Sequence, residues 1–517
     1  MRVAFELCRC FWSAGVPTQA LQFLPCAGAS VGPLLVGHPD LDVVILTGGT
    51  DTALEMLRGK PDMNLLAETG GKNATIVTAL SDREQAIAHV LHSAFSHSGQ
   101  KCSATSLLIL EQEVYDDADF RRALCDAVQS LKVGSAWDRR TCVGPLIGPP
   151  EGALESALKE LEPGESWAVM PRRHGDNPSL YSPGVKWGVK PGSVTHMTEF
   201  FGPVLGVMKA RDLSEAIALV NQTGYGLTSG LESLDDREQE FWQGQVRAGN
   251  LYVNRVTTGA IVLRQPFGGM GKSAFGPGIK AGGPNYVAQL MDFEDCGDPE
   301  VSDSIADPQL DDLRSRLPAA ADGREGLPAA EVSRVVLAIG SYDRNVRCEF
   351  GRTHDSFRLV GQDNLRRYLP IAELRVRLHP DDGLFELFAR VCAARCVGCR
   401  ITVSSPPGPS APGLALLEEL TEPWAGAIEF IEETDAELAR VILEGGTERV
   451  RYAAPGRVPT PVFEAAREAG LFVAAAPVLA EGRIELLWYL REQSISRDYH
   501  RYGNLGERAG EQRAGVT

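Results

Sequence analysis

Residues 68–104 read ETGGKNATIVTALSDREQAIAHVLHSAFSHSGQKCSA, with a carboxylate at one end and a thiol at the other. Glu68 precedes two glycines, and Cys102 lies in a second run of small residues. Small side chains let another group approach the backbone closely. Because a neighbouring cation favours the thiolate, Lys101 is expected to activate the sulfur, and Glu68 is a candidate general base. The alternative for an isolated cysteine is a buried structural thiol.

The sequence between these two ends predicts a strand followed by a helix. Ala74–Thr78 is expected to be a short buried strand. Ser81 and Glu84 have the spacing of a capping box, so a helix is expected to begin there. Apolar residues then recur at helical spacing at Ile87, Val90, Leu91, Ala94 and Phe95.

The motifs ETGGKN and GQKCSA together resemble the paired signature of the aldehyde dehydrogenase superfamily. This resemblance implies that Cys102 is the nucleophile and that Glu68 is the general base. It also implies an α/β fold: a partial Rossmann-like NAD-binding domain, an α/β catalytic domain and a second Rossmann-like α/β domain.

Composition excludes several other classes of protein. The chain has 517 residues and a net charge of −17, which argues against binding to nucleic acid or to an anionic membrane surface. Its 11 scattered cysteines fit a reducing, cytoplasmic setting better than a disulfide framework. No apolar run reaches membrane-spanning length, and the N-terminus does not have the pattern of a signal peptide. No metal site is expected.

Residues 1–67 are predicted to be the partial NAD-binding domain. Ala20–Leu24 and Val43–Leu46 are expected strands, and the second leads into Thr47-Gly48-Gly49-Thr50 and a helix. A glycine turn between strand and helix presents backbone N–H groups to a phosphate. By itself the turn is a weak signal, but it resembles the cofactor turn of the superfamily, which implies that Thr47, Gly48 and Gly49 contact the pyrophosphate of NAD.

Residues 68–293 are predicted to be the catalytic domain, and two further motifs carry the resemblance. EFFGPV implies that Glu199 accepts hydrogen bonds from the nicotinamide ribose and that Phe201 packs near the nicotinamide. Residues 249–286 resemble the loops of L-glutamate γ-semialdehyde dehydrogenases from proline utilization A proteins. This implies that the substrate carboxylate is held by Ser103, Gly259 and Ala260, with Phe267 against the aliphatic chain.

Residues 294–334 are acidic and rich in proline and alanine, and they are predicted to be a linker with one short helix. Residues 335–517 alternate between strand and helix patterns, which predicts a parallel, Rossmann-like sheet. This segment resembles the non-catalytic C-terminal domain of longer proline utilization proteins. The alternation over 484–490 is expected to form a flap strand that pairs with another domain. Cys392, Cys396 and Cys399 have metal-like spacing but are interpreted as structural thiols.

The resemblance covers the chain but not the whole family pattern. We expect the chain to begin inside the NAD-binding domain, as a truncated gene product, a fragment or half of a split protein. The Pro-Trp-Asn motif, whose Asn completes the oxyanion hole in the family, is absent. The expected reaction is the NAD-dependent oxidation of L-glutamate γ-semialdehyde. The alternatives are another aldehyde substrate, or an impaired chain that acts in assembly. The expected partners are a second copy or a proline dehydrogenase module.

Overall fold

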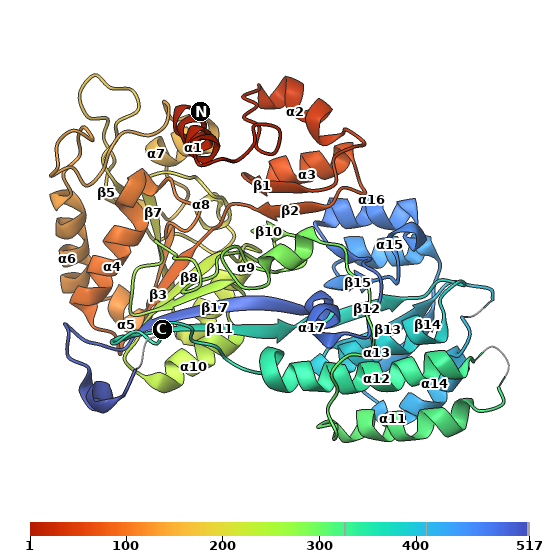
Figure 1. Cartoon of the computed structure of the whole chain (residues 1–517). Coiled ribbons are helices and arrows are strands. Elements are labelled where there is room, and N and C mark those ends of the chain that lie inside the picture. Colours follow the sequence, from red (N-terminus) through yellow and green to blue (C-terminus); the bar gives the residue numbers. More distant parts are fainter. Residues whose placement is uncertain (325–326, 410, 514–517) are drawn as a thin grey trace.

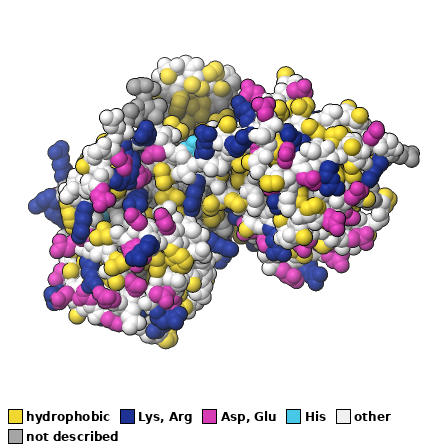
Figure 2. Space-filling view, turned by 90° about the horizontal axis from the view of Figure 1, so that it is seen from below, with side chains coloured by type: hydrophobic (Ala, Val, Ile, Leu, Met, Phe, Trp, Pro, Cys, Tyr) yellow, Lys and Arg dark blue, Asp and Glu magenta, His cyan; other side chains and the backbone are white. Residues whose placement is uncertain are grey.

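Three β-sheets organise this computed structural model, which describes residues 1–324, 327–409 and 411–513 (Figure 1). Residues 325–326 of the predicted linker and 514–517 of the predicted C-terminal domain lie outside the described residues. Helices cover the sheets, and the space-filling view shows two lobes on which acidic and basic side chains are interspersed (Figure 2). Within the described ranges, every helix is too short or too polar to cross a membrane.

The small N-terminal sheet contains two parallel strands, β1 (Val44–Thr47) and β2 (Leu65–Glu68). The two-residue strand β10 (Ala274–Phe275) pairs antiparallel with β2. Helix α3 (Thr50–Gly59) follows β1 and buries Ala53 and Leu57 against this sheet. The predicted strand, glycine turn and helix are therefore confirmed.

The first 36 residues contain two exposed helices, α1 (Arg2–Ser13) and α2 (Gly28–Val36), and neither buries a residue. The prediction of a strand over Ala20–Leu24 is wrong, since this segment forms turns and irregular backbone. Although the segment is apolar, no strand among the described residues lies beside it to supply the hydrogen bonds of a sheet.

Residues 68–293, the predicted catalytic domain, supply most strands of a nine-stranded sheet in the order β11-β17-β9-β8-β3-β4-β7-β6-β5. Its central strands are buried along nearly their whole length because helices cover both faces. Helices α4 and α6 pack on one face, and α9 and α10 pack on the other. The strands contributed by this domain are β3 (Ala74–Val77), β4 (Leu107–Glu111), β5 (Ser166–Val169), β6 (Gly184–Trp187), β7 (Val204–Ala210), β8 (Thr228–Glu232) and β9 (Asn250–Val253). The helices are α4 (Arg83–Phe95), α5 (Gln112–Tyr115), α6 (Ala118–Ser130), α7 (Gly152–Lys159), α8 (Val194–Met197), α9 (Leu213–Gln222) and α10 (Asp236–Gln245).

Helix α4 begins one residue later than its capping box predicted. The N-cap is Asp82, whose carboxylate accepts a hydrogen bond from Gln85 N at 3.2 Å. Ser81 instead donates its hydroxyl to the Thr78 carbonyl at 2.7 Å. Both residue types can cap a helix, and the turn after β3 occupies the serine.

The C-terminal unit contains a five-stranded parallel sheet in the order β14-β13-β12-β15-β16, as the alternating pattern predicted. Its first strand lies in the middle, which is the arrangement of a Rossmann-like sheet. The strands are β12 (Glu373–Arg377), β13 (Arg400–Ser405), β14 (Ile428–Glu432), β15 (Arg449–Arg451) and β16 (Val473–Ala474). The helices are α13 (Leu384–Val397), α14 (Leu414–Thr421), α15 (Asp435–Leu443), α16 (Thr460–Ala469) and α17 (Gly482–Glu485).

Two long helices begin within the segment that was predicted to be a linker. Helix α11 (Pro308–Ala321) and helix α12 (Ala329–Asn345) pack in the core of the C-terminal unit. The linker prediction is therefore wrong for α11, which is longer than the short helix expected there. The acidic and alanine-rich composition hid an apolar stripe formed by Leu310, Leu313 and Leu317, which are all buried.

The C-terminal unit adds two strands to the catalytic sheet (Figure 1). Strand β17 (Leu490–Asp498) pairs parallel with β9 and antiparallel with β11 (Gln362–Pro370). The prediction of a flap strand over residues 484–490 is wrong, and the strand that pairs with another domain is β17, which begins only at Leu490. Residues 484–489 are helical instead, and Leu486–Tyr489 point into the core, so burial produced the apolar pattern there.

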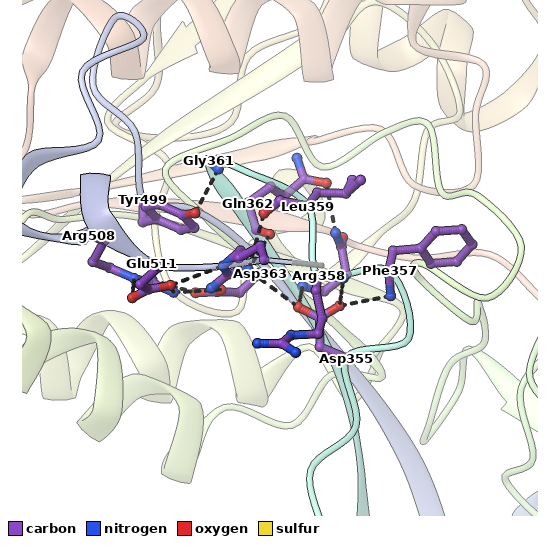
Figure 3. A network of polar contacts seen from close by, with 12 residues as sticks. Asp355, Phe357, Arg358, Leu359, Gly361, Gln362, Asp363, Tyr499, Arg508 and Glu511 are labelled. Carbon is purple, nitrogen blue, oxygen red and sulfur yellow. Dashed lines mark hydrogen bonds and ion pairs between the residues drawn. The ribbon is translucent and has the colours of Figure 1, made fainter. Parts of the chain in front are cut away.

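The segment after β17 folds back onto the loop before β11 through a polar network (Figure 3). Arg508 donates to both oxygens of the Asp363 carboxylate at 2.8 and 3.0 Å. Gly361 N donates to the hydroxyl of Tyr499 at 2.8 Å, and Arg508 also bonds Glu511. These contacts fix β11, at one edge of the sheet, to the segment that follows its neighbour β17.

Candidate active site

Glu68 is the last residue of β2, and it lies beside the glycine turn that follows β1. Thr47 is its register partner, and Gly48 N donates to the Glu68 carbonyl at 3.2 Å. The carboxyl ends of parallel strands are where open α/β sheets bind their ligands. The structure thus brings the predicted cofactor turn and the predicted base to one edge of the small sheet.

The carboxylate of Glu68 points to the glycine loop that precedes β10. Its Oε2 accepts a hydrogen bond from Gly269 N at 2.9 Å. Beside it lies a cavity of about 20 Å³, lined by Glu68, Gly268 and Tyr286 among others, which is large enough for one water molecule. Burial raises the pKa of Glu68 well above its ordinary value, against the opposing effects of Lys280 and of the Gly269 N–H. A carboxylate with a raised pKa is suited to accept a proton near neutral pH.

The two glycines after Glu68 are required because Glu199 lies directly against them. Glu199 Oε1 accepts a hydrogen bond from Gly71 N at 3.0 Å. A Cβ at Gly70 would lie 1.8 Å from Glu199 Oε2, so any other residue would displace the carboxylate. The structure therefore brings the ETGGKN and EFFGPV motifs into contact.

Asn73, at the end of the ETGGKN motif, holds the thiol loop and was not singled out as a site residue. Its Nδ2 donates to the carbonyl oxygens of Cys102 at 2.7 Å and of Ala104 at 2.9 Å. Its Oδ1 accepts from Thr228 N at 3.0 Å. One buried amide thus connects β3, the thiol loop and β8, and its place beside the glycines was the signal that could have identified it.

The backbone before Cys102 is tightly turned. His97, Ser98 and Gly99 have φ values of 55°, 57° and 68°, in the left-handed region that only glycine adopts freely. A Cβ at Gly99 would lie 2.3 Å from the Gly202 carbonyl oxygen. The loop is therefore packed against the EFFGPV motif, and the packing fixes the position of the sulfur.

The thiol of Cys102 is half-buried, and both carboxylates act on it. Burial raises its pKa above the ordinary value, and the charges of Glu199 and Glu68 raise it further, against the N–H groups of Ser103 and of Cys102 itself. Asn73 joins the thiol loop to the ETGGKN motif, and Glu199 contacts the glycines of that motif, so the three motifs lie around one site. The expectation that Lys101 activates the thiol is wrong for this resting structure. Its charge acts instead on His92, whose pKa it helps to lower.

The predicted substrate residues approach one another through Thr257. The hydroxyl of Thr257 donates to the Ser103 carbonyl at 3.1 Å, and Ser103 is buried. Gly259 follows two residues later, with φ at 88°, and both Gly259 and Ala260 are exposed. Their roles in holding a carboxylate stay predictions.

The two predicted aromatic residues lie in loops near these groups. Phe201 has φ at 52° and is 41% exposed, so its ring is not part of the core. Phe267 is half-buried, bonds Ala281 through its backbone in both directions, and immediately precedes the glycines that bind Glu68. Their contacts with cofactor and substrate stay predictions as well.

The predicted NAD-binding residues that are present in this chain have the chemistry that a bound dinucleotide requires. The turn Thr47–Gly49 leads into α3, and a Cβ at Gly49 would meet only the Thr52 hydroxyl, at 3.9 Å. The backbone N–H groups at this helix start are therefore open to a phosphate. Burial raises the pKa of Glu199, while the Gly71 N–H and the charge of Lys72 oppose this.

A cavity of about 550 Å³ lies next to this site between α3, residues 269–278 and the C-terminal unit. Thr50, Thr69 and Tyr225 line it, but neither Cys102 nor Glu199 does. The cysteines Cys392 and Cys399 lie in the core of the C-terminal unit, where burial raises the pKa of each thiol, that of Cys399 to about 12. Their environment agrees with the structural role predicted for them.

Several known proteins are similar to this chain in sequence and in structure. The 1-pyrroline-5-carboxylate dehydrogenase of Geobacillus thermodenitrificans is 35% identical over 300 residues, which are 56% of this chain and 57% of that protein. The structure of proline utilization A from Corynebacterium freiburgense matches 97% of this chain and 46% of its own length, at 36% identity and a TM-score of 0.79. The Thermus 1-pyrroline-5-carboxylate dehydrogenase with bound NAD matches 55% of this chain at 32% identity and a TM-score of 0.51.

The chain spans about half the length of these relatives. The profile of the aldehyde dehydrogenase family matches residues 2–295, which include the small sheet, Glu68, Cys102 and Glu199. This chain therefore belongs to the aldehyde dehydrogenase family.

Proposed function

We propose that this chain carries the catalytic part of an NAD-dependent L-glutamate γ-semialdehyde dehydrogenase, which forms L-glutamate in the second step of proline catabolism. The observation that supports this most is that contacts of Asn73 and Glu199 join the ETGGKN, GQKCSA and EFFGPV motifs into one site, beside the glycine turn that follows β1. Relatives named 1-pyrroline-5-carboxylate dehydrogenase support the choice of substrate.

In the proposed reaction, the thiolate of Cys102 adds to the aldehyde carbon, and the N–H of Cys102 stabilises the oxyanion. Bound NAD, held by Thr47, Gly48, Gly49, Glu199 and Phe201, supplies the hydride acceptor. Glu68 then takes a proton from the water that hydrolyses the thioester on Cys102. Ser103, Gly259 and Ala260 hold the substrate carboxylate through a hydroxyl and N–H groups, with Phe267 against its aliphatic part.

The test of the nucleophile is Cys102→Ala. The chain spans about half the length of its relatives, so for this assay the parent and the variant are each fused to the N-terminal part of the Geobacillus relative. The formation of NADH from the semialdehyde is then followed. The variant is expected to lose activity by a factor of about 10⁴ or more. Undiminished NADH formation would refute the assignment, and Cys142→Ala, at an exposed cysteine, is the matched control.

The test of the substrate is Ser103→Ala. Loss of the hydroxyl is expected to raise KM for the semialdehyde by about tenfold, because one hydrogen bond to a charged group is removed. KM for propanal, which lacks a carboxylate, is expected to stay the same. Equal effects on both aldehydes would remove the proposed role of Ser103.

We also propose that the chain works next to a proline dehydrogenase module, because the chain matches proline utilization A over 97% of its own length. Co-purification with the flavin-containing proline dehydrogenase part of that protein tests this partner. Sedimentation of the 517-residue chain alone tests the alternative, which is assembly with a second copy.

A further inference from the structure

A buried lysine lies on the far side of the glycines that bind Glu68. Lys280 is 1% exposed, and its Nζ donates to the carbonyl of Gly268, the neighbour of Gly269. A Cβ at Gly268 would lie 2.7 Å from Glu68 Oε1 and 3.3 Å from Lys280 Cγ. The backbone of Gly268 is thus enclosed between the carboxylate and the stem of the lysine. The ammonium therefore acts on Glu68 without forming a direct ion pair.

A second carboxylate faces this lysine from the C-terminal unit. Glu492 on β17 is 2% exposed, and its Oε2 accepts from Lys280 N at 2.9 Å. Its Oε1 accepts from Asn285 Nδ2 at 2.5 Å, and the same amide bonds the Tyr368 hydroxyl on β11 at 2.8 Å. Both strands that the C-terminal unit adds to the sheet therefore take part in holding the residues around Lys280.

The charges around Lys280 oppose the effect of burial. Burial lowers the pKa of Lys280, and the charges of Glu68 and Glu492 act against this. Burial raises the pKa of Glu492, while Lys280 and Arg366 oppose it. The charge of Glu68 also helps to raise the pKa values of Cys102 and Tyr286. An opposite charge a few ångströms away lowers a carboxyl pKa by about 1 to 3.

We propose that Lys280 is a positioning residue that keeps Glu68 ionised, and that Glu492 of the C-terminal unit holds Lys280 in place for this task. This inference rests on the proposed role of Glu68 as the base in thioester hydrolysis. It gives the C-terminal unit a direct influence on the chemistry, because a residue of β17 adjoins the lysine. Without the ammonium, burial dominates and Glu68 stays protonated to higher pH.

The test uses an acyl transfer that needs no dinucleotide. p-Nitrophenyl acetate acetylates Cys102: the thiolate adds to the ester carbonyl, p-nitrophenolate leaves, and an acetyl thioester remains. Water then adds to the thioester while Glu68 takes its proton, and acetate and the thiol are released. The burst of p-nitrophenolate from the 517-residue chain reports the nucleophile, and the deacetylation rate against pH reports the ionisation of Glu68.

Lys280→Met is expected to leave the burst unchanged and to move the inflection of the deacetylation profile up by about one pH unit. At pH 7 deacetylation then slows by about tenfold, while the plateau at high pH stays the same. Lys280→Arg keeps a positive charge and is expected to restore most of the profile. Glu492→Gln is expected to move the inflection in the same direction by a smaller amount.

The matched control is Lys272→Met, in the same loop. The ammonium of Lys272 donates to the Thr223 carbonyl at 3.3 Å and lies over the ring of Tyr225, away from Glu68. It carries the same charge, so an equal shift in this variant would show a general charge effect and would overturn the inference. In a Glu68→Gln background, Lys280→Met is expected to have no further effect on the pH profile.

Lys280→Met and Glu492→Gln could each give a normal burst of p-nitrophenolate and a deacetylation profile whose inflection stays at the pH of the parent. This result would overturn the inference and leave the assignment of Cys102 as nucleophile intact. If the parent chain gives no burst and Cys102 carries no acetyl group by mass spectrometry, the proposed function fails, and this inference fails with it. Thermal unfolding of each variant checks that the fold is retained.

Discussion

The catalytic domain and the C-terminal unit use similar α/β layers but bury their charges differently. In the C-terminal unit, Arg451 and Glu485 are both fully buried and lie 2.8 Å apart. Glu485 also accepts from the Tyr489 hydroxyl and from Leu479 N, so its carboxylate is well satisfied. In the catalytic domain, Lys72 has a buried Nζ with no hydrogen-bond partner among the described residues. Paired charges indicate structure, and incompletely paired ones mark the region of chemistry.

The largest effect on the free energy of unfolding is expected when the buried ion pair between Arg451 and Glu485 is broken. Arg451→Met leaves Glu485 as a buried, uncompensated charge, which costs about 3–5 kcal/mol of the free energy of unfolding. Urea unfolding followed by tryptophan fluorescence measures it. Adding Glu485→Leu is expected to recover most of the loss, because a well-packed apolar pair can replace a buried ion pair. A loss below about 1 kcal/mol in the single variant would contradict the comparison.

Removal of the charge of Lys72 is expected to stabilise the chain. Burial lowers the pKa of Lys72 from 10.5 to about 7. Between these two pH values the unfolded chain binds more protons than the folded one, so stability rises with pH across this window. Lys72→Met removes this dependence. The variant is therefore expected to be more stable than the parent by a few kcal/mol at pH 7, and the gain should vanish above pH 10.5. Chemical unfolding at a series of pH values measures it.

The control for this pH series is Lys190→Met, at an exposed position. It is expected to leave the stability at every pH within about 0.5 kcal/mol of the parent. If Lys72→Met shows no gain at pH 7, the description of Lys72 as an unsatisfied cation is wrong.

A smaller effect is expected when the thiols of the two regions are compared. Cys102 is half-buried beside the site, whereas Cys392 is fully buried and its pKa is raised further. At pH 8.5 iodoacetamide is expected to modify Cys102 faster than Cys392 by about 100-fold, because the reactive form is the exposed thiolate. Peptide mass spectrometry measures both rates in one sample. In urea the difference should disappear, and equal rates in the folded chain would contradict the assignment.

The smallest effect is expected at the surface contact that joins the two regions. Arg501 NH2 lies 2.7 Å from Asp82 Oδ2, and the arginine side chain is 56% exposed. Arg501→Ala is expected to cost about 0–1 kcal/mol, less at high salt, because solvent screens the pair. Asp82→Ala should cost more, since Asp82 also caps α4. Thermal unfolding at two salt concentrations separates the two contributions.

Sequence periodicity predicted the elements whose burial is regular along the chain. The strands and helices from β12 to β16 each have one continuous apolar run or stripe, and all were expected close to their observed positions. The same rule failed at residues 484–489, because a segment buried on all sides has no periodicity that separates helix from strand. It failed again at α11, where alanine, proline and acidic residues outnumber the leucines of the buried stripe.

The motifs predicted which residues meet in the site, and their local chemistry proved harder to predict. Glu68, Glu199 and Cys102 were expected at one site, and contacts of Asn73 and Glu199 join the three motifs that contain them. Their roles in the reaction stay predictions. The predicted effect of Lys101 was wrong, because sequence proximity does not show that burial and two carboxylates outweigh one half-buried cation in setting the pKa of Cys102. Asn73 and Lys280 were not identified, since their importance depends on contacts between segments far apart in the chain.

The position of β17 has a consequence for the order in which the molecule is made. This strand lies between β11 and β9, so the hydrogen bonds of β9 along that edge are completed only by residues 490–498. During synthesis the ribosome delivers β9 long before its neighbour. The nascent nine-stranded sheet therefore exposes an unpaired edge until residues 490–498 have been made, and chaperones have a defined interval in which to protect it.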